Sequence, residues 1–233
     1  MSFAFKTQNV FRGLLPAKAP TLSTNAGVIW KDWIFGFYGG VDFEGRYQET
    51  DFLLIYRRPR INFHLEYYYN FTEGISDIPT PSGLFDFNKQ TTRGLLDFIV
   101  NIKLDKEKRW TLSSSTIIFG RDTNLEERIV GNEIITVRTD QRYSQYLELK
   151  HAWLWDDNKV EAHFGGNFSW HDLSGSTFYG KSAGINNIGI AFTKKLEIND
   201  KVKVPVKASF YLNPQAEKSY LILTVNLIQL SKI

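Results

Sequence analysis

Cysteine is absent from the 233-residue chain, and methionine occurs once. Without cysteine the protein has neither a disulfide framework nor a thiolate metal site, although this leaves its compartment open. Long apolar runs are also missing, since the longest stretch without a charged residue, Ser219–Ser231, has thirteen residues. A membrane-spanning helix needs roughly 18 to 20 apolar residues. The sequence therefore excludes a helical membrane protein.

A strong charge of one sign is absent as well. Lys and Arg total 28 against 25 Asp and Glu, and these charges are scattered along the chain. No basic block is available for phosphate contacts, so nucleic acid is not an expected partner. The histidines His64, His151, His163 and His171 show no metal-ligand spacing, and no cofactor is expected. With 42% hydrophobic residues, the chain is predicted to form one folded domain over residues 1–233.

What the sequence does contain is the two-residue period of β-strands. In segment 60–71, alternate positions are Ile, Phe, Leu, Tyr, Tyr and Phe on one face, and Arg, Asn, His, Glu, Tyr and Asn on the other. An extended strand of that sequence separates an apolar wall from a polar one. The same division recurs in segments 93–104, 160–171 and 202–213. The pattern indicates an all-β chain.

About twelve strands are predicted, at residues 2–13, 20–31, 33–45, 49–58, 59–71, 92–105, 109–121, 141–155, 159–171, 182–198, 202–213 and 217–231. Tight polar turns occur at residues 31–32, 57–59, 105–108, 156–158 and 199–201. Between them lie longer links, around residues 14–19, 72–91, 122–140 and 172–181. This asymmetry is typical of an outer-membrane barrel with short periplasmic turns and longer extracellular loops. The predicted fold is therefore a transmembrane antiparallel β-barrel with both termini in the periplasm.

Tryptophan placement supports this prediction. Five of the six tryptophans lie beside the short turns, namely Trp30, Trp33, Trp110, Trp153 and Trp155. Indole rings favour the level of the lipid headgroups, so a row of them at one depth indicates an interfacial girdle. The alternative is a soluble β-sandwich in which these rings form the core. Sandwich strands have about five or six residues, whereas the predicted strands have about eleven to fourteen, so the barrel is favoured.

The link 122–140 contains a hairpin of its own. The segments 128–130 and 133–135 flank Gly131-Asn132, a pair suited to a two-residue turn. We expect a small β-ribbon that projects outside the barrel. Counting its arms into the wall would give fourteen strands as an alternative, but the arms are short for the roughly nine to eleven residues of a transmembrane strand.

Short matching segments occur in the first hundred residues: Asn9-Val10-Phe11-Arg12-Gly13, Gly36-Phe37-Tyr38-Gly39-Gly40-Val41, Glu49-Thr50-Asp51 and Tyr67-Tyr68-Tyr69. Together they resemble an uncharacterised family of bacterial outer-membrane barrels, the conserved hypothetical proteins labelled by a Gly-Cys-Trp tag. The aromatic-Arg-Gly element at the end of the first predicted strand is the most specific match, and the cysteine of the tag has no counterpart here. The resemblance implies an outer-membrane location in a Bacteroidetes-like organism. It implies no activity.

The alternation directs charges of both signs into the barrel lumen. The candidate solute-binding residues near mid-wall are Arg60, Glu66, Arg93, Asp97, Glu148, Lys150 and His163. A barrel of about twelve strands lies between eight-stranded barrels filled by side chains and sixteen-stranded water-filled porins, so the pore size depends on how these charges pair. In one interpretation they only neutralise one another. In the other, the protein is a narrow passive channel for small, anionic solutes.

Two other functions stay open. A non-conducting barrel would serve as an anchor or accessory subunit of an envelope assembly, with Phe85-Asp86-Phe87 and the ribbon 122–140 as its contact surface. A hydrolase acting on lipid would use His163 and Ser169, which share the predicted inner face. On this strand His163 is four residues from Asn167 and eight from His171, which is about 13 or 27 Å, too far for a nucleophile and a base to form a hydrogen bond. An enzyme is therefore not expected. We expect a monomer in the bacterial outer membrane, in contact with its lipid.

Overall fold

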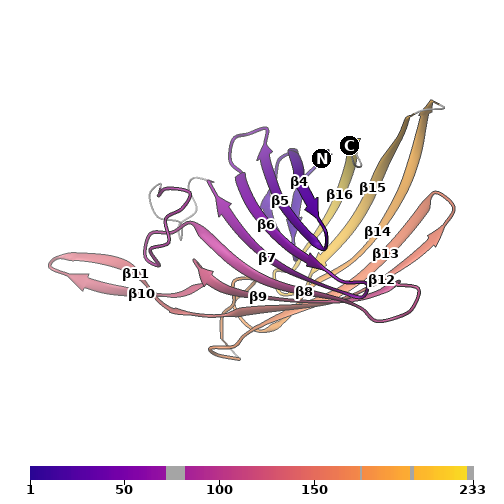
Figure 1. The fold of residues 1–233 in the computed structure, drawn as a ribbon. Helices are drawn as coiled ribbons and strands as arrows, with labels where there is room; N and C mark the ends of the chain where they lie inside the picture. Colours follow the sequence, from indigo (N-terminus) through magenta and orange to yellow (C-terminus); the bar gives the residue numbers. More distant parts are fainter. Residues whose placement is uncertain (72–81, 174, 200–201, 230–233) are drawn as a thin grey trace.

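The computed structural model describes residues 1–71, 82–173, 175–199 and 202–229. In these ranges twelve antiparallel strands close into a barrel (Figure 1), which confirms the predicted fold class and strand count. Around the barrel the strands are β1 (Ser2–Lys6), β16 (Lys218–Gln229), β15 (Val202–Asn213), β14 (Gly184–Asn199), β13 (Asn158–Ser169), β12 (Ser144–Trp155), β9 (Trp110–Gly120), β8 (Gly94–Lys103), β7 (Ile61–Asn70), β6 (Gln48–Arg57), β5 (Trp33–Asp42) and β4 (Thr21–Trp30). The described residues include no helix long and apolar enough to cross a membrane.

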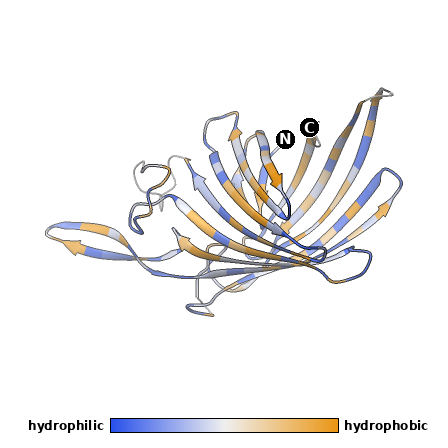
Figure 2. Cartoon of the chain, viewed as in Figure 1, coloured by the Kyte–Doolittle hydropathy of each residue, from blue (hydrophilic) through white to orange (hydrophobic). Residues whose placement is uncertain are grey.

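The strand alternation determines which side chains face outward. On β8, Phe98 is exposed on the outer surface, whereas its neighbours Asp97 and Ile99 are buried inside. Figure 2 shows the same alternation of hydrophobic and hydrophilic residues along the other wall strands. The result is an exposed apolar belt around the barrel, formed among others by Phe35, Phe52, Leu65, Phe98, Leu149, Phe164, Phe192, Phe210, Leu221 and Leu223. Exposed apolar surface on this scale indicates a surface that contacts either a protein partner or a membrane.

The two ends of the barrel differ as predicted. The start of β1 and the end of β16 lie at the end with the short turns, here called the turn end, and the longer links lie at the opposite loop end (Figure 1). Trp30, Trp110, Trp153 and Trp155 are exposed near the turn end, and Trp33 pairs with Trp30 beside them. Parts of four predicted segments, residues 72–81, 174, 200–201 and 230–231, lie outside the described residues.

The predicted ribbon is confirmed as a separate two-stranded sheet. β10 (Thr123–Val130) pairs with β11 (Glu133–Gln141) and projects from the loop end, clear of the wall (Figure 1). The fourteen-strand alternative is therefore wrong. At the tip of the ribbon Ile129 and Ile134 form a cross-strand pair, and Ile129 is 80% exposed.

The first predicted strand is wrong in its second half. Wall strand β1 ends at Lys6, and the chain then forms β2 (Asn9–Phe11) and β3 (Leu14–Ala17), a hairpin separate from the wall sheet. The chain reverses because Arg12 and Gly13 take left-handed φ values of 49° and 81°. We call residues 9–17 the lumen hairpin, because its tip contacts the inner faces of distant wall strands, as described below.

We expect Gly13→Ala to loosen the lumen hairpin. A Cβ at this position would lie 1.9 Å from the backbone oxygen of Asn186, on a backbone that already disfavours side chains. The expected loss in the free energy of unfolding is about 1–3 kcal/mol. Amide hydrogen exchange measured by mass spectrometry should show lower protection across residues 9–17.

The matched control is Gly131→Ala at the ribbon tip. Its φ of +63° is also left-handed, but a Cβ there would meet nothing within 4 Å. Loss of protection should be confined to the ribbon in this variant. Unchanged protection of residues 9–17 in Gly13→Ala would contradict the close contact between the hairpin tip and β14.

Candidate functional site

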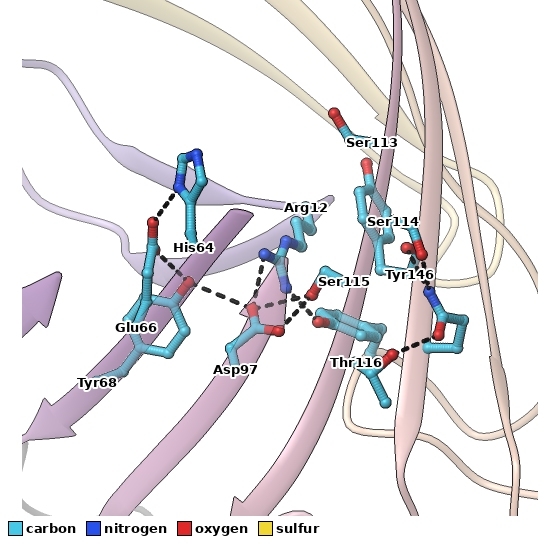
Figure 3. A network of polar contacts seen from close by, with 12 residues as sticks. Arg12, His64, Glu66, Tyr68, Asp97, Ser113, Ser114, Ser115, Thr116 and Tyr146 are labelled. Atoms are coloured by element: carbon cyan, nitrogen blue, oxygen red, sulfur yellow. Dashed lines mark hydrogen bonds and ion pairs between the residues drawn. The ribbon is translucent and has the colours of Figure 1, made fainter. Parts of the chain in front are cut away.

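The tip of the lumen hairpin is held to the wall by a buried ion pair. Arg12 Nη2 lies 2.8 Å from Oδ2 of Asp97 on β8, and the Asp97 side chain is 0% exposed (Figure 3). Arg12 Nη1 donates to the hydroxyl of Tyr179, in the β13–β14 loop, at 2.5 Å. Burial raises the pKa of Tyr179 to about 12, so the phenol stays neutral beside the guanidinium.

The backbone of the tip is bound from the other side of the barrel. Asn186 Nδ2 on β14 donates to the carbonyl of Arg12 at 2.8 Å, and Asn213 Nδ2 on β15 donates to the carbonyl of Gly13 at 2.9 Å. In the closed strand order, β14 and β15 lie four and five strands from β8. The hairpin tip therefore bridges nearly opposite walls and occupies the lumen at this level.

Asp97 is compensated by hydroxyl groups as well as by Arg12. Ser115 Oγ, on the adjacent strand β9, lies 2.6 Å and 2.9 Å from its two carboxylate oxygens, and the Tyr68 hydroxyl lies 3.3 Å from Oδ2. The Arg12 guanidinium also lies over the Phe11 ring, 4.6 Å from its centroid. A buried carboxylate requires partners of this kind, because desolvation costs several kcal/mol per ion.

A second carboxylate continues this network along β7. Glu66 Oε1 lies 2.8 Å from Nδ1 of His64, and Glu66 Oε2 accepts a hydrogen bond from Tyr68 at 2.7 Å (Figure 3). The other nitrogen of His64 lies 3.3 Å from Nδ2 of Asn101. Tyr68 thus connects the carboxylates of Glu66 and Asp97 on neighbouring strands.

A third carboxylate lies on β12. Tyr146 donates to Glu148 Oε2 at 2.6 Å and accepts from Asn187 Nδ2 at 2.7 Å. His163 Nε2 lies 3.2 Å from Asn187 Oδ1. The Tyr146 ring lies 5.4 Å from the Arg12 guanidinium, so this group adjoins the hairpin tip from β12, β13 and β14.

Towards the turn end the inner wall is basic. Lys103 Nζ donates to Thr111, and Lys159 Nζ lies 2.7 Å from Glu161 Oε1. Lys103 lies close enough to Lys150 and Lys159 for mutual electrostatic repulsion. Glu161 attracts Lys150, Lys159 and Lys207. We call the four lysines Lys103, Lys150, Lys159 and Lys207 the lysine basin. Glu161 is the carboxylate within it.

Five of the seven sequence-predicted site residues face the lumen, and their role in binding a solute stays a prediction. Glu66, Asp97, Glu148 and His163 belong to the hydrogen-bonded groups around the hairpin tip, and Lys150 belongs to the lysine basin. The mid-wall positions of Arg60 and Arg93 are wrong. Arg60 is exposed in the β6–β7 turn, where Pro59 lacks the N–H needed to extend the wall pairing. Arg93 precedes β8 at the loop end, where Nη1 donates to the carbonyl of Phe71 at 3.5 Å.

Sequence reasoning missed the aromatic partners of the site. It included Arg12 in the first predicted wall strand, and it assigned no role to Tyr68, Tyr146 or Tyr179. The aromatic-Arg-Gly element was the available signal for the hairpin tip, because glycine after arginine permits a reversal. Tyr179 lies in a loop without strand periodicity, so no pattern predicted its position.

The inner-face serine considered for hydrolysis has a different arrangement. Ser169 Oγ donates to the carbonyl of Arg142 at 2.6 Å and accepts the backbone N–H groups of His171 and Asp172. These bonds cap the start of the β13–β14 loop. No group of three or more His, Asp or Glu side chains in the described ranges is arranged to hold a metal ion.

No known family model matches the chain, and neither does any curated protein. The resemblance to the Gly-Cys-Trp family thus stays a prediction from short motifs, and the site is interpreted from its own geometry.

We expect the Arg12–Asp97 pair to show strong energetic coupling. Either Arg12→Gln or Asp97→Asn alone should lower the free energy of unfolding by about 3–5 kcal/mol, because each leaves a buried group without its partner. The double variant should lose less than the sum of the single losses. Urea unfolding of the refolded barrel, applied to the wild type, the two single variants and the double variant, measures this coupling in a double-mutant cycle.

The exposed pair Arg58 and Asp32, with Nη1 and Oδ2 3.2 Å apart at the turn end, is the matched control. Its coupling should be about 0–1 kcal/mol, as for other solvated ion pairs. Additive losses at Arg12 and Asp97 would show that the pair does not hold the hairpin.

Proposed function

We propose that the protein is a bacterial outer-membrane β-barrel that conducts small anionic solutes along a narrow path past the lumen hairpin. The proposed location is supported by the apolar belt, the tryptophans near the turn end and the difference between short turns and long loops. Among the outward positions of the described wall strands, Lys194 near the turn end is the charged exception. Such a surface suits a hydrocarbon environment, where a charge at mid-depth is costly.

The observation that carries the proposed transport function is the division of the lumen by the hairpin. The tip is pinned between β8 and β14–β15, so solutes have only the space beside it. On the turn side of this constriction the lysine basin presents four cations around the carboxylate of Glu161. Rings of lysine select anions by their field. The expected conductance is therefore low, with a preference for anions.

A second candidate function is an anchor or accessory subunit, and the ribbon favours it. Its apolar tip is exposed beyond the wall, where a partner protein could cover it. Phe85 and Phe87 do not share this position. Their rings pack against Phe52 and Tyr67 on the outer face of the wall, at centroid distances of 6.0 and 5.7 Å. This places them towards lipid, so the ribbon is the better candidate for a protein contact.

The proposed membrane location predicts a depth-dependent cost of charge on the outer surface. Leu149→Arg, at the middle of β12, should lower the free energy of unfolding in lipid vesicles by about 2–4 kcal/mol. Ile198→Arg, near the turn end of β14, should cost about 0–1 kcal/mol, because the arginine reaches the interface. Both residues are exposed, so packing losses are small. Equal costs at the two positions would argue against insertion in a bilayer.

The transport proposal is tested by single-channel recording in a planar bilayer across a salt gradient. Small, stable conductance steps with an anionic reversal potential are expected from the intact protein. Arg12→Gln should enlarge the steps, because the hairpin tip loses its bond to β8. Lys150→Gln combined with Lys207→Gln should move the reversal potential towards zero, because the lumen loses its preference for anions.

The control removes two lysines outside the lumen, Lys106→Gln with Lys108→Gln in the exposed β8–β9 turn. It should leave the reversal potential nearly unchanged. Electrical silence from protein shown to be folded and inserted would overturn the channel and favour the accessory function. Cation preference in the intact protein would overturn the role of the lysine basin.

A further inference from the structure

A separate cavity of about 260 Å³ lies between the lumen hairpin and the wall. The hairpin contributes Phe11 and the run Leu14-Leu15-Pro16, and the β13–β14 loop contributes Phe178. The wall contributes Tyr68 of β7 and Leu95 of β8. These side chains give the cavity a mainly apolar and aromatic lining, the usual character of a small-molecule site.

The polar groups of the cavity all lie at the loop end. Glu49 is near the start of β6, Asn70 ends β7, Arg93 precedes β8, and Arg121 follows β9. The ends of four adjacent strands therefore form a polar rim above an apolar interior. A ligand with one charged end and an apolar body matches this division.

The charges of the rim favour an anion. The rim has two arginines and one carboxylate. Glu49 attracts Arg121 electrostatically and also accepts hydrogen bonds from Tyr47 at 3.2 Å and from Asn70 at 3.3 Å. Arg121 lies over the Phe178 ring, 5.4 Å from its centroid, which aligns the guanidinium with the aromatic lining. Guanidinium groups bind carboxylates through charge-assisted hydrogen bonds. The net charge of the rim is positive.

We propose that this cavity binds a medium-chain carboxylate, with its head at Arg93 and Arg121 and its alkyl chain between the hairpin and Leu95. The volume equals that of about nine liquid water molecules at roughly 30 Å³ each, which suits a ligand of about ten non-hydrogen atoms such as octanoate. Because Phe11 and Leu14 flank the Arg12–Gly13 tip, a bound chain would contact the hairpin directly. This binding does not require conduction, so it stands apart from the transport proposal.

The test is isothermal titration of octanoate into the full chain in lipid nanodiscs, with empty nanodiscs as background. Saturable binding of one octanoate per barrel is expected. Octanol, which has the same chain without the charge, should bind at least about tenfold more weakly, because charge-assisted hydrogen bonds are lost. Equal binding of octanoate and octanol, or binding no greater than to empty nanodiscs, would overturn the proposal.

Variants locate the binding to the cavity. Arg121→Gln should weaken octanoate binding about tenfold, whereas Arg58→Gln, which removes an exposed turn-end arginine, should not. Leu95→Trp on β8 should fill the cavity with an indole ring and so prevent octanoate from binding. If this variant does not fold, Leu15→Trp on the lumen hairpin fills the same cavity. Wild-type affinity in a folded blocking variant would overturn the site. If the protein binds octanoate but gives no conductance in the planar bilayer, only the transport proposal is overturned. If it conducts but does not bind octanoate, only the proposed carboxylate site is overturned.

Discussion

The arrangement of the barrel interior depends on the ion pair between Arg12 and Asp97. A carboxylate with no exposed surface has to be matched by charge and hydrogen bonds, and the guanidinium at the hairpin tip supplies both. The wall provides the carboxylate on β8, whereas amides on β14 and β15 bind the carbonyls of the tip. The position of the hairpin therefore follows from polar groups on nearly opposite walls and not from apolar packing alone.

Fixing the hairpin at this level gives the two halves of the lumen different chemistry. On the loop side, the apolar residues of the hairpin face the wall and leave a cavity with a polar rim. On the turn side, the lysine basin lines the wall beyond the tip. Three tyrosines lie between the halves. The Tyr68 hydroxyl joins the carboxylates of β7 and β8, the Tyr179 hydroxyl accepts from Arg12, and the Tyr146 ring lies beside Arg12 while its hydroxyl donates to Glu148 on β12. One short hairpin thus separates a mainly apolar cavity with a polar rim from a lysine-rich part of the lumen.

The two-residue period predicted the wall because it is a local consequence of an apolar outer surface on one side of each strand and polar groups on the other. It failed at residues 9–17, since a hairpin inside a lumen meets polar and apolar neighbours in a similar alternation. Only a tertiary contact distinguishes the two: Gly13 approaches the backbone of Asn186 in β14, 173 residues later in the chain. Arg93 was misplaced for a related reason, because alternation gives the face of a residue and not its depth. Connections such as the one holding Tyr179 carry no period at all.

A buried ion pair holds a segment inside a barrel in a different way from apolar packing. An apolar plug resists opening in proportion to its buried area. A buried pair contributes little net stability relative to apolar side chains of the same shape, yet breaking it by removal of one partner is costly. The position of the lumen hairpin is thereby specified geometrically without a large gain in overall stability. With Arg12 at its tip and Asp97 on β8, the lumen hairpin holds one defined position through a contact that adds little net stability.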